Sequence, residues 1–218
     1  MAKKMNRALL GSSLDRAVAC IRKGGIVAFP TETYYGLAVD PYSLAAVTRL
    51  FQVKRRQADK PLLLLIENIS QLQTIAENIP PEFEPLIEKY WPGPLTLVFP
   101  ARKEIYRQLT GNSGTIGVRV SSHPTAIELV RRLGKPITAT SANISGHRPA
   151  STAEDVLAIF GNSLSYIIDG GPTAGGLCST VLGILEGKCT VLRQGQINLS
   201  AELRQESHCL TRSVTHHS

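Results

Sequence analysis

The sequence predicts an α/β protein built on a mixed parallel and antiparallel sheet. Short apolar segments, such as 26–29 and 62–66, alternate with segments whose apolar residues recur at helical spacing. Later in the chain, apolar segments at 181–185 and 190–193 flank Glu186-Gly187-Lys188, a sequence typical of a β-hairpin. A hairpin adds antiparallel strands to the sheet, so we expect a mixed sheet rather than an all-parallel one.

The helices are predicted from apolar spacing and from residues that favour helix ends. Apolar residues between positions 14 and 21 share one face, which Ser12 or Ser13 can cap and Gly24-Gly25 can end. Ser43 can cap a second helix that continues through Phe51. Further helices are expected at 70–78, at 81–90, at 124–133 with Pro124 in its first turn, and at 152–160 with Ser151 or Thr152 as its cap.

The strands are predicted from short apolar runs bounded by turn-forming residues. Besides 26–29 and 62–66, strands are expected at 95–99 after the turn-forming Trp91-Pro92-Gly93-Pro94, at 115–120, at 137–140 and in the hairpin. Residues 54–60 are expected to form a loop before the strand at 62–66. We expect one domain over residues 1–198, followed by a short helix or tail over 199–218.

The composition is that of a folded domain with a basic surface. The 218 residues are 43% hydrophobic and 19% charged, which allows a sizeable buried core. The formal net charge of +7 favours anionic partners such as nucleotides, nucleic acids or acidic lipids. A soluble basic protein without such a partner explains the charge equally well.

Cysteines, histidines and apolar runs exclude several classes of protein. The four cysteines form no CxxC element, and the five histidines show no metal-binding grouping. We interpret the cysteines as reduced thiols. The longest apolar run, 61–66, is too short to cross a membrane, and the N-terminus lacks the apolar segment of a signal peptide. We therefore expect a soluble, cytoplasmic protein without a membrane partner.

Common catalytic motifs are absent from the sequence. It contains no GxxxxGK[ST] phosphate loop, no GxGxxG after a strand, no HExxH and no GxSxG. If the protein is an enzyme, its chemistry must rest on polar residues in loops at the ends of strands, where α/β folds place functional groups.

Two loops offer such groups. Residues 54–60 hold four cations, Lys54, Arg55, Arg56 and Lys60. Cations so close together repel one another unless an anion neutralises them, and phosphate is the natural one. A solvated basic loop is an equally good interpretation of this segment alone. Ser141-x-Asn143 offers uncharged groups that can orient a ligand, although a helix cap or Asx turn is the better explanation of that motif alone.

Taken together, the polar and apolar segments resemble the YrdC family of threonylcarbamoyl-AMP synthases. The matching stretches occur in the family's order: GGIVAFPTETYYGL, KRR followed by DKPL, WPGPLTLVFPA, GTIGVRVSSHP, PITATSANISG, IIDGG, CSTVLGI and TVLRQG. The resemblance extends from about Leu14 to Gly195. The K-x-R and S-x-N elements are each weak, but the ordered set gives a strong joint signal.

The resemblance implies a fold and a reaction. The fold would be YrdC-like, a twisted mixed sheet with helices on both sides and a concave basic face. The reaction would join L-threonine, bicarbonate and ATP into L-threonylcarbamoyladenylate and pyrophosphate, a nucleotidyltransferase step toward threonylcarbamoyladenosine beside the tRNA anticodon. Mg²⁺ would accompany ATP. A threonylcarbamoyl transferase would consume the adenylate, and the basic face is a candidate surface for tRNA or other RNA.

The resemblance also implies residue roles. Lys54 and Arg56 would make the catalytic phosphate contacts, and no side chain is assigned to a metal. The ATP-binding set comprises Lys54, Arg56, Lys60, Thr115, Asn143, Ser151 and Arg193. The threonine-binding set comprises Thr33, Arg119, Ser141 and Ser179. Arg119 lies in an apolar strand and can hold a carboxylate in a bidentate fork; the alternative is a structural ion pair with an Asp or Glu of the fold.

The sequence departs from the family pattern at some positions. Leu65 stands where many members carry a His that contacts threonine, and Gln57 replaces a common Pro. The chain resembles the short form of the family, without the extra C-terminal domain. Three alternatives remain open: a nucleotide- or RNA-binding paralogue without threonine activity, an RNA-binding module without chemistry, and the carbamoyl-adenylate domain of a hydrogenase-maturation protein.

Overall fold

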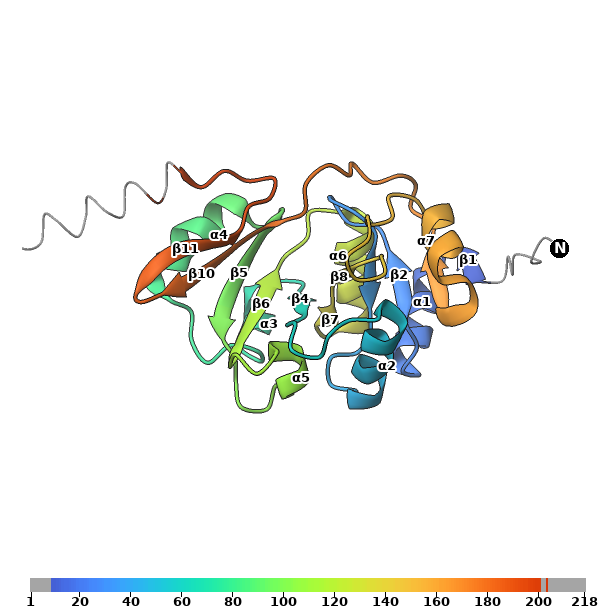
Figure 1. Ribbon diagram of the computed structural model, residues 1–218, viewed down its shortest axis with the longest axis horizontal. Coiled ribbons are helices and arrows are strands. Elements are labelled where there is room, and N and C mark those ends of the chain that lie inside the picture. Colours follow the sequence, from blue (N-terminus) through green and yellow to red (C-terminus); the bar gives the residue numbers. More distant parts are fainter. Residues whose placement is uncertain (1–8, 201–202, 204–218) are drawn as a thin grey trace, which may run out of the picture.

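The structure, a computed structural model, describes residues 9–200 and residue 203 (Figure 1). Over these residues the strands form two sheets, one of five strands and one of six. Each sheet contains both parallel and antiparallel pairs, such as parallel β2–β9 and antiparallel β2–β3 in the first. The predicted mixed α/β fold is therefore confirmed, with its strands divided between two hydrogen-bonded sheets.

The two sheets have different strand orders. The five-stranded sheet has the order β1 (Leu10–Gly11), β9 (Tyr166–Ile168), β2 (Val27–Phe29), β3 (Gly36–Ala38) and β8 (Thr140–Ser141). The six-stranded sheet has the order β11 (Lys188–Arg193), β10 (Thr180–Leu185), β5 (Leu95–Pro100), β6 (Thr115–Arg119), β4 (Leu63–Leu65) and β7 (Ile137–Thr138). In Figure 1 the six-stranded sheet extends from the left to the centre of the molecule, and the five-stranded sheet lies to its right.

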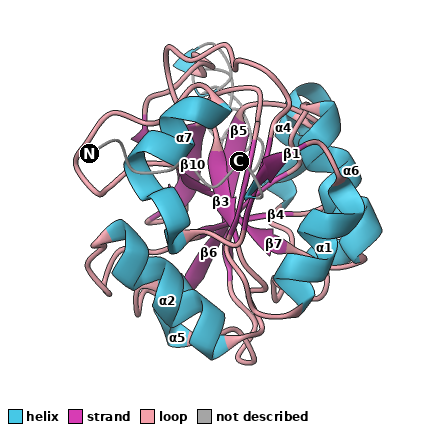
Figure 2. Cartoon of the chain, turned by 90° about the vertical axis from the view of Figure 1, so that its right-hand side faces the viewer, coloured by secondary structure: helices cyan, strands magenta, loops and turns pink. Residues whose placement is uncertain are grey.

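The helices pack around these sheets. They are α1 (Leu14–Arg22), α2 (Leu44–Lys54), α3 (Ile69–Leu72), α4 (Glu84–Tyr90), α5 (Arg107–Thr110), α6 (Pro124–Leu133) and α7 (Ala153–Phe160), with single 3₁₀ turns at Pro81–Phe83 and Gly161–Ser163. Figure 2 shows α2 and α7 on one side of the strands and α1 and α6 on the other. None of the described helices is long and apolar enough to cross a membrane.

Strand alternation explains why helices cover both faces of the five-stranded sheet. In β2, Val27 and Phe29 belong to a buried cluster with residues of α1 and α6, whereas Ala28 belongs to a second cluster with residues of α2 and α7. All three side chains are fully buried. A strand with helices on both faces needs apolar residues at every position, which is why 26–29 reads as a continuous apolar run.

Most predicted element ends are confirmed, because local residues determine them. Ser13 and Ser43 accept hydrogen bonds from the first turns of α1 and α2, and Thr152 forms a capping box with Asp155 at α7. The helix predicted at 70–78 is wrong in length. It ends at Leu72, and Ala76 then makes an isolated β-bridge to Ala101. Tertiary pairing there takes precedence over helix continuation.

Two other predictions need adjustment. Lys54 was expected in a loop but is the last residue of α2. The strand expected at 137–140 is divided: β7 pairs with β4, and β8 pairs with β3 in the other sheet, with Ala139 between them.

Most of the predicted terminal helix or tail lies outside the described residues. Cys20 and Cys178 are free thiols, as predicted, whereas Cys209 is outside the described residues.

Candidate functional site

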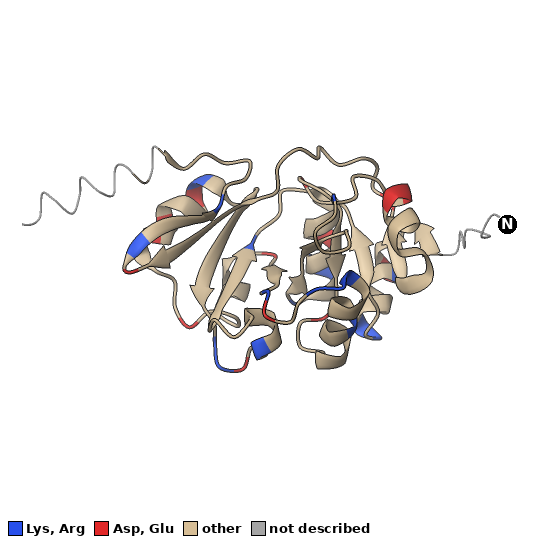
Figure 3. Cartoon of the chain, viewed as in Figure 1, with Lys and Arg blue, Asp and Glu red and all other residues tan. Residues whose placement is uncertain are grey.

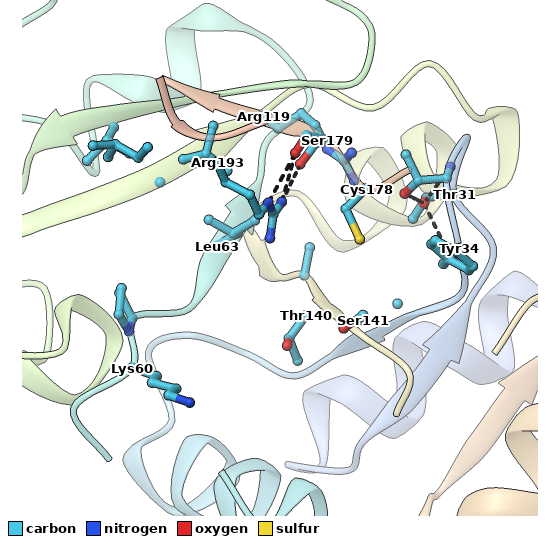
Figure 4. Close-up of a pocket in the computed structure, with 18 of the residues that line it drawn as sticks. Thr31, Tyr34, Lys60, Leu63, Arg119, Thr140, Ser141, Cys178, Ser179 and Arg193 are labelled. Carbon is cyan, nitrogen blue, oxygen red and sulfur yellow. Dashed lines mark hydrogen bonds between the residues drawn. The ribbon is translucent and has the colours of Figure 1, made fainter. Parts of the chain in front are cut away.

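A cavity of about 520 Å³ lies between the two sheets. The five-stranded side contributes Thr31, residues 33–36 and Ser141, and the six-stranded side contributes residues of β4, β5, β6, β10 and β11. Eight predicted site residues line it: Arg56, Lys60, Thr115 and Arg193 from the ATP set, and Thr33, Arg119, Ser141 and Ser179 from the threonine set. Figure 4 shows Lys60 at one side of the cavity and Thr31 and Tyr34 at the other.

Three cations, Arg56, Lys60 and Arg193, line the cavity and form its cationic wall. Figure 3 shows the connection from α2 to β4 as a largely blue stretch near the centre of the molecule. Burial, together with the charge of Arg193, lowers the pKa of Arg56, while Asp59 acts in the opposite direction. The positive charges of Arg56 and Arg193 therefore repel each other, and an anion with several charges would relieve this repulsion.

Backbone carbonyls hold two of these arginines in place. Arg56 donates from Nη2 to the carbonyl of Pro61 at 2.8 Å. Arg193 donates from Nη2 to the carbonyl and Oγ of Ser179, at 2.9 and 3.0 Å (Figure 4). Each guanidinium keeps further N–H groups beyond these contacts, because it carries five donors. The remaining N–H groups of both arginines are thus held in fixed positions at the cavity.

Gly111 packs against the connection from α2 to β4, the segment that carries Lys60. This glycine ends α5 with a left-handed φ of 58°, and a Cβ there would lie 2.2 Å from the carbonyl oxygen of Asp59. Gly134 ends α6 with φ 76° and has no atom within 4 Å of such a Cβ. The two positions share the same backbone strain but differ in crowding.

Gly111→Ala should therefore destabilise the protein more than Gly134→Ala. The left-handed conformation alone costs an alanine about 1 kcal/mol. Crowding at Gly111 should add about 1 kcal/mol more, because the segment that carries Lys60 must move away. Urea unfolding of both variants measures the difference. Equal losses of stability in the two variants would mean that the segment carrying Lys60 moves away from the added methyl group without cost.

The cavity lining also carries several hydroxyl groups. The side-chain oxygens of Thr31 and Thr33 lie 3.0 Å apart, and those of Ser179 and Thr96 lie 2.9 Å apart. Ser141 donates from Oγ to Oδ1 of Asn143 at 2.7 Å. Such neutral groups orient the polar atoms of a small ligand.

Arg119 is buried beside these hydroxyls and is paired with Glu32. Its Nη1 lies 3.0 Å from Oε1 of Glu32, and the two side chains are 7% and 13% exposed. The other carboxylate oxygen of Glu32 accepts a hydrogen bond from Ser121. The structure thus shows the ion pair that was the alternative interpretation of Arg119. Burial lowers the pKa of Arg119, Glu32 raises it, and Arg193 lowers it further.

The ion pair leaves part of the guanidinium unused. Nε of Arg119 is buried and has no hydrogen-bond partner in the described part of the chain. Since Arg119 also lines the cavity, a ligand carboxylate could supply that partner while Glu32 keeps its contact.

Three predicted site residues are not on the cavity wall. Lys54 is 1% exposed and donates to backbone and side-chain oxygens of the Ser141–Asn143 loop. Asn143 donates from Nδ2 to the carbonyl of His147 at 2.6 Å. Ser151 donates from its backbone and its Oγ to Asp155 at the start of α7. The structure therefore places these three in supporting hydrogen-bond networks.

Sequence reasoning missed other residues at the site. Cys178 and Tyr34 line the cavity, and Tyr34 donates to the carbonyl of Gly176 at 2.8 Å. Glu32, the only acid in PTETYYG, could have been recognised as a partner for Arg119 from its isolation among neutral residues. Leu65 is buried in the cluster beneath α1 and α6 and does not line the cavity.

Comparisons with known proteins agree with this arrangement. A family model described as telomere recombination, and named for Sua5, YciO and YrdC, matches residues 19–195. A threonylcarbamoyl-AMP synthase of Pyrococcus abyssi is 43% identical over 84% of this chain, which spans 54% of that relative. A threonylcarbamoyl-AMP synthase of Coxiella burnetii is 38% identical over 74% of this chain, and the match covers 88% of that relative.

A solved structure shows the same likeness. The crystal structure of Pyrococcus abyssi Sua5 in complex with L-threonine superposes with a TM-score of 0.84 at 39% identity. The match covers 89% of this chain and 59% of that one. The fold, the ordered motifs and the matched range point the same way: this chain belongs to the Sua5/YciO/YrdC family.

Proposed function

We propose that this protein is a threonylcarbamoyl-AMP synthase, which joins L-threonine, bicarbonate and ATP. One observation carries the proposal: a single cavity holds both a cationic wall and a hydroxyl-rich part that contains Arg119. The first suits a triphosphate, and the second suits a small amino acid with a hydroxyl group. Relatives of this chain are named for this activity, and one was crystallised with L-threonine.

In this proposal the two ligands meet at the centre of the cavity. Arg56, Lys60 and Arg193 bind phosphate oxygens. Arg119 receives the carboxylate of threonine at its free Nε, and Ser141 and Ser179 bind the remaining polar groups. Arg119 in β6 and Arg193 in β11 belong to the same six-stranded sheet, so that sheet fixes the separation of the two sites.

The chemistry follows from that placement. The amine of threonine and bicarbonate give a carbamate and water, and a carbamate oxygen then attacks the α-phosphorus of ATP. The bond from that phosphorus to the bridging oxygen breaks, and pyrophosphate leaves with the electron pair. Cations aimed at the phosphoryl oxygens stabilise the charge that develops there. Holding the reactants together can contribute about 7–11 kcal/mol, so the proposal needs no covalent enzyme intermediate.

Mg²⁺ is proposed to enter with ATP, held by the triphosphate oxygens. The described residues contain no group of three or more His, Cys, Asp or Glu that could hold a metal ion. The adenylate is a reactive mixed anhydride, so a transferase must consume it promptly. We propose that this transferase delivers the threonylcarbamoyl group to tRNA.

Pyrophosphate release should require threonine and bicarbonate together. Each is part of the nucleophile, so omitting either one should stop the reaction rather than slow it. L-Valine has the shape of threonine without its hydroxyl and should be a poor substitute, because buried hydroxyls would lose their partner. A coupled pyrophosphate assay and detection of labelled adenylate measure this. Release that ignores both co-substrates would favour the nucleotide-binding paralogue.

A further inference from the structure

Lys54 has an environment unlike that of the other cations near the cavity. It is the last residue of α2, and Arg55, with a left-handed φ of 51°, turns the chain immediately after it. The turn sends Arg56 to the cavity wall, while the Lys54 side chain runs into the protein and is 1% exposed. Neighbours in sequence thus have separate surroundings.

The ammonium of Lys54 is fully occupied by oxygen atoms of the protein. It donates to the carbonyl of Ser141, to the carbonyl of Asn143 at 2.9 Å and to Oδ1 of Asn143 at 3.1 Å. An ammonium has three N–H donors, so these three acceptors leave none for a phosphate. The backbone adds a further link, because Ser145 donates to the carbonyl of Lys54 at 2.9 Å.

The segment that Lys54 holds reaches the cavity. Ser141 lines the cavity wall, and its Oγ donates to the same Oδ1 of Asn143 that accepts from Lys54. On the other side, Ala142 donates its backbone N–H to the carbonyl of Tyr35 at 2.7 Å. Lys54 therefore sits behind the wall and fixes the loop from which the Ser141 hydroxyl projects.

Burying the Lys54 ammonium costs free energy, and its hydrogen bonds to buried oxygens offset that cost. Burial, and then the charge of Arg56, lower the pKa of Lys54 to about 7. Within the described part of the chain, Lys54 has no carboxylate partner, and its charge faces carbonyl and amide oxygens alone. Without the ammonium, the carbonyl of Asn143 would lose its donor, and the Ser141 carbonyl and Oδ1 of Asn143 would each keep only one other donor, so losing the charge would also cost free energy.

We propose that Lys54 is a positioning residue that shapes the Ser141–Asn143 loop and does not contact phosphate. This departs from the phosphate-binding role that the family resemblance implies for Lys54. It rests on the proposed function only in taking Ser141 as part of the threonine site. The arrangement of the loop itself follows from the contacts above.

Three variants separate positioning from phosphate binding. Lys54→Met keeps the length of the side chain and removes the donors. Arg56→Ala removes a cation from the wall, and Lys23→Met removes an exposed lysine that follows α1. The readouts are calorimetric binding of pyrophosphate and backbone hydrogen exchange at residues 142 and 143. Neither readout depends on the proposed reaction, so failure of that reaction leaves this test intact.

The expected results are opposite for the two residues. Lys54→Met should speed exchange at 142 and 143 by about tenfold or more, with pyrophosphate affinity within about twofold of the unmodified protein. Arg56→Ala should weaken pyrophosphate binding by about tenfold and leave the exchange unchanged. Lys23→Met should do neither. Pyrophosphate binding that falls as far in Lys54→Met as in Arg56→Ala would overturn the proposal.

A measurement on the unmodified protein covers the case in which Lys54→Met does not fold. With ¹⁵N-labelled lysine, the Lys54 ammonium should give a signal protected from solvent exchange that pyrophosphate leaves in place. The Lys60 signal should move in the same titration, because Lys60 lines the cavity. A Lys54 signal that moves with that of Lys60 would show a direct phosphate contact and refute the positioning role.

Discussion

Glu32→Ala should lower the free energy of unfolding by about 3–5 kcal/mol, the range for breaking a buried ion pair by removing one partner. The variant leaves the guanidinium of Arg119 buried without its carboxylate, and it also removes the acceptor of Ser121. A charge in that position cannot recover its hydration by a small shift, because its side chain is only 7% exposed. The loss therefore includes the desolvation of an unpaired cation.

Glu104→Ala is the matched control for this experiment. Glu104 pairs with Arg102 at 3.6 Å, but the two side chains are 74% and 46% exposed. Solvent screens such a pair, so its loss should cost less than about 1 kcal/mol. Chemical denaturation of both variants provides the comparison. Similar small losses would show that Arg119 reaches water or another partner when Glu32 is removed.

His123 gives a second, independent readout of the same change. Burial lowers the pKa of His123, and the charge of Glu32 partly offsets that effect. Removing the carboxylate should therefore lower the pKa of His123 further, since the protonated imidazole loses a favourable charge. An NMR titration of the imidazole measures the direction. A pKa that rises would mean that the two groups are not coupled as the structure indicates.

Arg119→Lys should weaken the binding of L-threonine by about 1.5–3 kcal/mol, the range for a hydrogen bond to a charged group. Lysine keeps the positive charge and can keep the contact with Glu32. It has one nitrogen in place of a planar fork, so it cannot serve Glu32 and the carboxylate of threonine in two directions. The unpartnered Nε of Arg119 is the group that lysine lacks.

ATP provides the internal control for Arg119→Lys. The phosphate contacts are proposed for Arg56, Lys60 and Arg193, so the affinity for ATP should change little. Calorimetric titration of each ligand into both proteins separates the two sites. An unchanged affinity for threonine would confine Arg119 to its structural ion pair, and equal losses for both ligands would place it at a shared position.

Much of the fold was predictable because local chemistry determines it. Ser13 and Thr152 cap their helices, and Glu186 and Gly187 take φ values of 51° and 75° in the predicted hairpin turn. Strands β3 and β9 carry no comparable local signal. They owe their extended form to pairing with β2, a neighbour that the sequence alone does not identify.

The candidate site was predictable as a set of residues but not as a geometry. The cavity-lining residues were named by motif resemblance, and the structure brings most of them together. Adjacent cations in a sequence look equivalent, so the separation of Lys54 from Arg56 depends on the end of α2 and the turn at Arg55. Likewise, the partner of Arg119 lies 87 positions earlier in the chain, at Glu32, and the only local sign of it is that Glu32 is the single acid in its segment.

The divided strand at 137–141 has a consequence for how the protein folds. The chain builds β1 to β3 in the five-stranded sheet and β4 to β7 in the six-stranded one, then returns for β8 and β9 before finishing with β10 and β11. No single cut of the chain would give two pieces that each hold a complete sheet. The cavity walls therefore assemble only when segments distant in sequence have paired, and a half-finished chain presents no ligand site.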